Sequence, residues 1–217
     1  MNVTDAVMTR TSVRDFLPDP VDNTVIATLL EKASRAPSGG NLQPWRVWVI
    51  NGDSMSAFLK HMDDSPSSQS LEYEIYPPKL WDPYRTCRYR VGEQLYATIG
   101  VDRDNKPGRL KQFARNMEFF GAPAAIFCFV DRRLSLPQWS DLGMFLQTFM
   151  LLAEEVGYQT CAQEAWSTAH EQIRSFTQAP DDLMLFCGVA IGRANRDHPI
   201  NSLVTDRLPL DQFATFL

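Results

Sequence analysis

Residues 141–157 read DLGMFLQTFMLLAEEVG and carry the most regular hydrophobic pattern in the chain. Apolar side chains recur there every three or four positions, which is the period of one helix face. These positions are Leu142, Phe145, Leu146, Phe149, Leu152, Ala153 and Val156. Gly157 supplies a stop signal, because glycine readily takes the left-handed conformation that ends helices. The pattern predicts a helix over residues 141–156.

Apolar runs on both sides of this helix predict strands. Residues 124–130 and 183–191 contain almost no polar side chains, which is typical of buried strands. A strand is also predicted at residues 45–50, where tryptophan and β-branched residues precede an Asn51-Gly52 turn. A short strand is predicted at residues 158–162, directly after the central helix.

Capping and stop signals predict three further helices. One follows Asp22 and ends where Ala36 precedes a proline, because proline disfavours helical backbone in the residue before it. One begins at Pro107 and ends before Gly121, and one is capped by Ser167. The apolar face of the second consists of Leu110, Phe113, Ala114, Met117 and Phe120. Helices with few strands and no fixed-length repeat indicate one domain, residues 1–217, of the α/β or α+β class.

Composition excludes several classes of protein. The 217 residues are 44% hydrophobic and 22% charged, which is typical of a globular chain and excludes disorder. A net charge of -5 argues against a broad surface for nucleic acid or for an anionic membrane. Residues 1–14 have no signal-peptide core, and the longest apolar stretch, residues 122–130, is too short to span a bilayer. A cytoplasmic location is therefore expected.

Cysteine and histidine spacing indicates neither disulfides nor a metal site. Cys87, Cys128, Cys161 and Cys187 form no C-x-x-C pair, and three of them lie in apolar runs. Buried thiols in a reducing compartment are the simplest interpretation. The three histidines are scattered, and no motif for a phosphate loop, a nucleophile elbow or a zinc protease occurs.

The first polar motif is RTSVRDF at residues 10–16. If this segment is extended, Arg10, Ser12 and Arg14 project from the same side and can bind one anionic ligand through guanidinium and hydroxyl groups. The alternative is a solvated basic turn, because exposed arginines are common.

Two further features carry polar groups suited to ligand binding. The loop PSGGNLQPW, residues 37–45, offers amide donors and acceptors at Asn41 and Gln43 that suit the edge of a heterocycle. Its glycines let the backbone approach a planar ligand closely. Arg207 lies alone in a polar tail. The alternatives are an ordinary helix-to-strand loop and another surface charge.

Residues 66–106 differ in composition from the rest of the chain and are expected to form a substrate lid. Tyrosine, tryptophan and arginine alternate there with polar residues. Tyr84, Arg85 and Arg88 are the candidate substrate residues, because they can stack on an aromatic ring and bind a carboxylate. The alternative is a solvated loop and helix whose aromatic residues pack at a dimer interface.

Together these motifs resemble those of the nitroreductase family of FMN-dependent oxidoreductases, closest to the 4-nitrobenzoate reductase-like branch. The resemblance rests on R-x-S-x-R-x-F at residues 10–16, A-P-S-G-x-N-x-Q-P-W at 36–45, DLG at 141–143, GYQTCAQEA at 157–165, GVAIG at 188–192 and RLP at 207–209. These matches occur in order and extend from one end of the chain to the other.

The resemblance implies an α+β fold with a central mixed sheet surrounded by helices, assembled as an intertwined homodimer with FMN at the subunit interface. The positions that match cofactor-binding residues of the family are Arg10, Thr11, Ser12, Arg14, Pro37, Ser38, Asn41, Gln43, Gln163, Glu164 and Arg207. Arg14 is expected to stabilise reduced flavin, and the backbone of Glu164 and Ala165 is expected to lie near flavin N5. Some members carry a basic residue where this chain has Thr205, so Arg10 and Arg207 are expected to bind the phosphate.

The implied activity is reduction of nitroaromatic compounds to hydroxylamines by ping-pong hydride transfer through flavin N5. NADPH or NADH is the expected transient donor, and a small aromatic acceptor takes its place. The resemblance also allows an FMN-dependent quinone or ene reductase, a dehalogenase, or a flavin-binding protein without catalysis. Neither nucleic acid, a membrane nor a metal is an expected partner.

Overall fold

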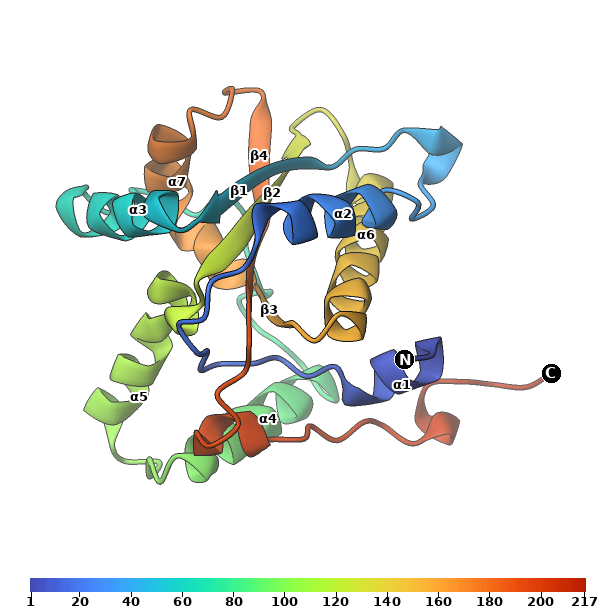
Figure 1. The fold of residues 1–217 in the computed structure, drawn as a ribbon. Helices are drawn as coiled ribbons and strands as arrows, with labels where there is room; N and C mark the ends of the chain where they lie inside the picture. The colour runs from blue at the N-terminus through green and yellow to red at the C-terminus, as the bar shows by residue number, and fades with distance from the viewer.

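The computed structural model describes residues 1–217 and is built around one four-stranded sheet (Figure 1). The strands are β1 (Arg46–Asn51), β2 (Ala124–Asp131), β3 (Gln159–Gln163) and β4 (Leu183–Gly192), in the order β1-β2-β4-β3. All four predicted strands are confirmed to within about a residue or two. The expectation of a mixed sheet is wrong for these strands, since every neighbouring pair is antiparallel. Parallel pairing is limited to one bridge between Ser12 and Thr160.

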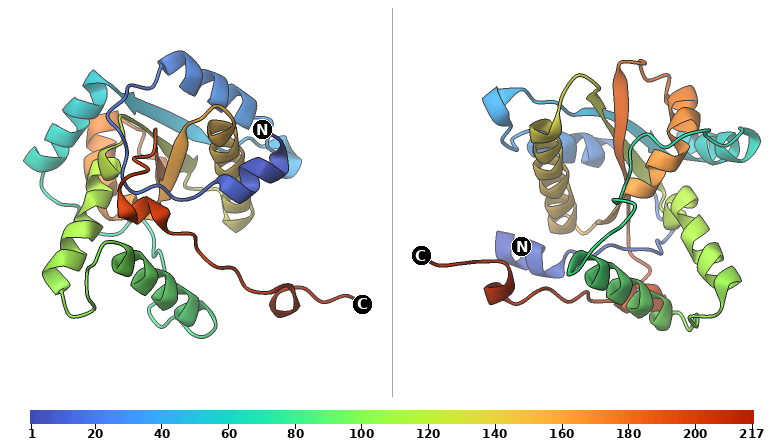
Figure 2. Two further views of the ribbon diagram at one scale, coloured as in Figure 1. Left: turned by 60° about the horizontal axis from the view of Figure 1, so that its bottom comes forward. Right: turned by 180° about the vertical axis from the view of Figure 1, so that it is seen from behind.

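Helices surround the sheet, as expected for the α+β class (Figures 1 and 2). The α-helices are α1 (Val3–Thr9), α2 (Asn23–Ala33), α3 (Asp53–Asp64), α4 (Tyr84–Thr98), α5 (Lys106–Ala114), α6 (Leu136–Glu155) and α7 (His170–Thr177). Short 3₁₀ helices are η1 (Gly39–Asn41), η2 (Arg115–Gly121), η3 (Glu164–Ala169), η4 (Pro199–Ser202) and η5 (Leu210–Gln212). None of these helices is long and apolar enough to cross a membrane.

Both faces of β2 are covered, which explains its continuous apolar sequence. Ile126 and Cys128 belong to a buried cluster formed with α2 and α6. Phe127 and Phe129 alternate with them and belong to a second cluster, formed with α3, η3 and α7. The sheet is therefore the middle layer between two helical layers.

Helix α6 begins five residues earlier than the sequence pattern predicted. Ser135 precedes it, and the backbone N–H of Ser135 donates to Gln138 Oε1 at 3.3 Å. Pro137 lies in the first turn, where its missing N–H costs no hydrogen bond. The predicted apolar face is buried at Leu142, Phe145 and its neighbours toward α2 and the sheet.

The helix predicted from Pro107 to Gly121 is wrong in its second half. Helix α5 ends at Ala114, and Phe119 and Phe120 take left-handed conformations with φ of 47° and 57°. Such backbone costs about 1–3 kcal/mol per residue, but burying each phenylalanine returns about 1.5–3 kcal/mol. Leu110 and Phe113 of the predicted apolar face are 69% and 57% exposed in the single chain.

Ser167 does not cap a helix, contrary to expectation. It lies inside η3 at 2% exposure, and α7 begins at His170. The reason is Trp166, which is fully buried and draws η3 into the core against Phe58 and Phe119. The residue at the N-cap of α7 is Ala169, so Ser167 lies two positions too early to cap this helix.

The four cysteines are free thiols, as predicted. Cys128, Cys161 and Cys187 are buried, whereas Cys87 on α4 is partly exposed. Burial raises the pKa of Cys161 to about 11 and that of Cys187 to about 12. These thiols stay protonated at neutral pH, so they serve packing and not nucleophilic chemistry.

Candidate functional site

A cleft of about 560 Å³, here called the N-terminal cleft, brings together both ends of the chain. Its lining residues are Val7, Met8, Arg10, Thr11, Ser12, Arg14, Gln147, Leu203, Val204, Thr205 and Arg207. The structure thus joins the 10–14 motif to Arg207, which lies almost at the other end of the sequence. The C-terminal segment runs below α1 in Figure 1, and Leu203, Val204, Thr205 and Arg207 line the cleft together with Val7 and Met8 of α1. The left view of Figure 2 shows the rest of the C-terminal tail extending away from that helix.

The motif is positioned by docking onto the open edge of β3. Ser12 bridges to Thr160, and the N–H of Val13 donates to the Thr160 carbonyl at 3.1 Å. Val13 is only 2% exposed and anchors the segment in the core. Arg10, Ser12 and Arg14 all line the cleft, and so does Thr11 between them.

Sequence reasoning missed the polar network that holds Arg14 in place. The Arg14 N–H donates to Asn201 Oδ1 at 2.8 Å, and Asn201 Nδ2 donates to the Asp15 carbonyl at 2.7 Å. The Asp15 carboxylate pairs with Arg115 at 2.8 Å and accepts from Asn195 Nδ2 at 2.9 Å. Asp15 belonged to the motif, but lone asparagines in a polar tail carry no sequence signal.

The N-terminal cleft has an uncompensated positive charge. Arg10, Arg14 and Arg207 form no ion pair with any carboxylate in the chain. Arg207 Nη1 is instead oriented by the Thr205 hydroxyl at 2.7 Å, so the departure from the family pattern at Thr205 has a structural role. Three guanidiniums without a carboxylate partner, with neighbouring hydroxyls, fit a phosphate dianion.

A second cavity of about 620 Å³, here called the β3 cavity, lies at the end of β3. Gln163, Glu164 and Ala165 line it together with Ile75, Tyr76, Arg88, Phe113, Asn116, Gly143, Leu146, Met150, Ala162, Phe186 and Cys187. Gln163 is 2% exposed, and its Nε2 donates to the Asn116 carbonyl at 2.9 Å. Burial raises the pKa of Glu164. The three predicted residues therefore lie in one cavity, apart from the arginine motif.

Trp166 and Gly188 fix the backbone at the β3 cavity. A Cβ at Gly188 would lie 2.3 Å from Trp166 Cδ1, so the tryptophan packs directly on the glycine backbone of β4. This close approach requires glycine and sets where the preceding residues, Glu164 and Ala165, emerge from β3.

The two cavities are linked by a smaller cleft of about 330 Å³. It shares Thr205 and Arg207 with the N-terminal cleft, and Tyr76 and Arg88 with the β3 cavity. The positive charges of Arg14 and Arg10 also act on Cys161 of β3, where they oppose the effect of burial on its pKa. The cationic and the apolar part of the site are thus neighbours.

The loop carrying Pro37, Ser38, Asn41 and Gln43 lies elsewhere. None of the four lines either cavity, and the loop projects at the upper right of Figure 1, away from α1. It has a definite shape, because Gly39 N–H donates to the buried Asp141 carboxylate at 3.2 Å. Within one chain these residues are not brought to the site.

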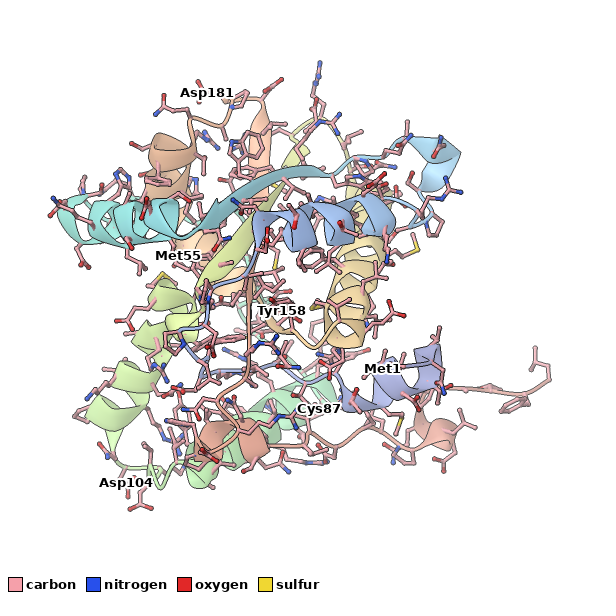
Figure 3. All side chains as sticks on the ribbon, in the orientation of Figure 1. Met1, Met55, Cys87, Asp104, Tyr158 and Asp181 are labelled. Carbon is pink, nitrogen blue, oxygen red and sulfur yellow. The ribbon has the colours of Figure 1, made fainter.

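The three candidate substrate residues differ in location. Arg88 lines the β3 cavity and lies 4.2 Å from the centre of the Tyr76 ring. Arg85 is held by Asp82 at 2.5 Å, and Tyr84 is 58% exposed. In Figure 3 their helix, α4, is marked by Cys87 below the sheet. No group of three metal-ligating side chains occurs in the chain.

Comparisons with known proteins agree with this geometry. The model of the nitroreductase family matches residues 7–193. A nitrobenzene nitroreductase from Ectopseudomonas oleovorans is 32% identical over 99% of this chain and 96% of its own length. A 4-nitrobenzoate reductase from Pseudomonas putida is 33% identical over 98% of this chain and 95% of its own. The crystal structure of the FMN and NADPH-dependent nitroreductase NfnB from Sphigopyxis sp. strain HMH superposes with a TM-score of 0.94 at 40% identity, covering 100% and 99% of the two chains.

Proposed function

The chain belongs to the nitroreductase family, and from that premise we propose that it is an FMN-dependent oxidoreductase that reduces nitroaromatic compounds to hydroxylamines with NAD(P)H. One observation carries this proposal: Arg10, Arg14 and Arg207, which form no ion pair, line one cleft beside the β3 cavity. A phosphate group and an aromatic ring system are both accommodated by such a site.

The residues present fit FMN. Arg10, Thr11, Ser12 and Arg207 would hold the phosphate, since they present guanidinium and hydroxyl donors to one cleft. Gln163 is buried with its Oε1 unpartnered, which leaves an acceptor for a ligand N–H. When bound, FMN supplies hydride transfer at N5, from NAD(P)H and then to the acceptor.

Arg14 is the residue proposed to tune this chemistry. Its backbone is fixed by Asn201, and its guanidinium has no carboxylate partner. A fixed cation beside the pyrimidine edge of the ring stabilises the negative charge gained on reduction and so raises the reduction potential. The backbone of Glu164 and Ala165 would face N5, while the raised pKa of Glu164 lets its carboxyl keep a proton to higher pH than a solvated glutamate.

The proposed assembly is a homodimer that completes each site. Pro37, Ser38, Asn41 and Gln43 match family positions that pack on the ring from the partner subunit, and they lie away from both cavities of their own chain. Phe213 and other large apolar side chains are exposed in the single chain, and a second copy of the chain can cover them. Sedimentation velocity is expected to give a dimer, whereas a monomer that holds FMN tightly would contradict the shared site.

The activity is tested by anaerobic titration of the FMN-loaded protein with NADPH and with NADH while the flavin absorption band is followed. Rapid bleaching is expected with at least one donor, followed by recovery of the band when a nitroaromatic acceptor is added. Binding of FMN without bleaching would favour a flavin-binding protein, and failure to bind FMN would overturn the proposal.

We also propose that residues 66–106 of a single domain form a lid in which Arg88 recognises an acceptor carboxylate. Replacing Arg88 with alanine is expected to raise the KM for 4-nitrobenzoate by about 10- to 100-fold, the value of a charge-assisted hydrogen bond. The KM for nitrobenzene should change little. Arg85→Ala is the matched control, because Arg85 is paired with Asp82 outside the cavity. Equal effects on both acceptors would contradict carboxylate recognition.

A further inference from the structure

A buried carboxylate lies outside both cavities, at Glu72. Its side chain is only 1% exposed and contacts three basic groups. Arg132 Nη2 lies 2.5 Å from Oε1, and His170 Nδ1 and Arg174 Nη2 lie 2.5 Å and 3.5 Å from Oε2. The backbone N–H of Glu72 also donates to the Ser167 carbonyl at 3.1 Å. None of these groups has a part in cofactor binding as proposed above.

The contacts of Glu72 join the start of the lid to two separate parts of the fold. Arg132 follows β2, whereas His170 and Arg174 lie on α7. Figure 2, right, shows the connection from α3 to α4, the segment that contains Glu72, crossing the back of the molecule. Burying a charged group costs desolvation free energy. At Glu72 the basic side chains around the carboxylate offset this cost. Glu72 thus connects the segment between α3 and α4 to the end of β2 and to α7.

The residues just after Glu72 form one wall of the β3 cavity. The Tyr73 hydroxyl donates to the Phe186 carbonyl, and its ring packs edge-on against Trp139 with centroids 5.2 Å apart. Ile75 and Tyr76 then line the cavity. Glu72 and the residues that line the cavity therefore belong to one short segment, residues 72–76.

The wall in turn carries the guanidinium proposed to recognise the acceptor. Arg88 stacks on Tyr76 at 4.2 Å, and both line the β3 cavity together with Glu164 and Ala165. Contacts therefore connect the segment at Glu72 to Tyr76 and Arg88, whereas none of these three residues lines the N-terminal cleft.

We infer that Glu72 is a positioning residue for the acceptor: its buried ion pair with Arg132, together with its contacts to His170 and Arg174, holds residues 72–76 as the wall of the β3 cavity. This inference rests on the proposed function. In this inference Glu72 affects the affinity for the acceptor but not the affinity for FMN, although its side chain contacts neither ligand.

The test compares Glu72→Gln with the matched control Glu74→Gln in the FMN-loaded protein. Glu74 lies two residues further on the same segment, is exposed and forms no ion pair, so both variants lose one negative charge. Glu72→Gln is expected to raise the KM for a nitroaromatic acceptor by about 10- to 100-fold, the cost of misplacing a binding wall by about 1 Å. Its FMN affinity should stay within about twofold of wild type, and Glu74→Gln should match wild type throughout.

Hydrogen exchange followed by mass spectrometry supplies a readout independent of turnover. Amides of residues 70–83 are expected to exchange faster in Glu72→Gln while those of α6 do not change. If Glu72→Gln does not fold, Glu72→Asp serves instead, because it keeps the charge but cannot reach all three partners.

Three outcomes would overturn the inference: exchange at residues 70–83 equal to that of Glu74→Gln, an unchanged acceptor KM, or loss of FMN together with faster exchange throughout the sheet. The last would make Glu72 a general stabiliser of the fold. If wild type itself failed to reduce any nitroaromatic, the proposed function would fall, and the exchange rates would still decide whether Glu72 holds the wall.

Discussion

Replacing Arg10 and Arg207 together with alanine is expected to raise the Kd for FMN by about 10²–10⁴-fold. Each guanidinium makes a charge-assisted hydrogen bond to the phosphate worth about 1.5–3 kcal/mol, and 1.4 kcal/mol is a factor of ten. Both side chains line the N-terminal cleft without a carboxylate partner, so their loss leaves no internal ion pair broken. Quenching of FMN fluorescence on titration of the apoprotein measures the effect.

Arg196→Ala is the control for charge. Arg196 is exposed, lies outside the cleft lining and forms no ion pair, so its removal changes the net charge without touching the proposed phosphate site. Its Kd should stay close to wild type. A double variant that binds FMN like wild type would show that the phosphate is held elsewhere.

Gly188→Ala is expected to lower the free energy of unfolding by about 1–3 kcal/mol, the usual cost of overpacking a core. The added Cβ would lie 2.3 Å from Trp166 Cδ1 and 2.9 Å from Nε1. Trp166 cannot yield easily, because it is fully buried against Phe58 and Phe119. Since Trp166 and Glu164 share one 3₁₀ turn, FMN affinity should fall as well.

Urea denaturation at one fixed protein concentration measures this loss, with Gly92→Ala as the matched control. A Cβ at Gly92, inside α4, meets no atom within 4 Å, so that change should be neutral or stabilise by about 0.4–1 kcal/mol. Equal stability of Gly188→Ala and wild type would mean that Trp166 has room to move and does not fix the backbone at the β3 cavity.

The hydrophobic pattern of the sequence was sufficient to predict the helices and strands that bury a continuous apolar surface. Leu142, Phe145 and Phe149 mark α6, and the uninterrupted apolar run of β2 reflects a strand covered on both sides. The pattern failed where tertiary packing overrides local preference. Phe119 and Phe120 leave the helix because two aromatic rings gain more in the core than regular backbone would.

The candidate site was predictable where residues lie in short motifs and unpredictable where they act across the sequence. Arg10, Ser12 and Arg207 meet in one cleft as expected. Nothing in the sequence marked Asn201 as the partner of Arg14, or Glu72 as the partner of Arg132. Polar contacts between segments that are far apart in the chain produce no periodic pattern in the sequence. The residues of loop 37–43 line neither cavity of their own chain, so their place at the site rests on the proposed dimer.

The proposed lid, residues 66–106, lies between two strands that are paired with each other. Strands β1 and β2 are neighbours in the sheet, and residues 52–123 connect them. The entropic cost of closing a loop grows only with the logarithm of its length, so doubling such a connection costs about 0.6 kcal/mol. Insertions or deletions in the proposed lid would therefore alter one wall of the β3 cavity at a small cost in the stability of the sheet. Under the proposed function, a change in lid length would alter the choice of substrate while the arginines proposed to bind the cofactor stay in place.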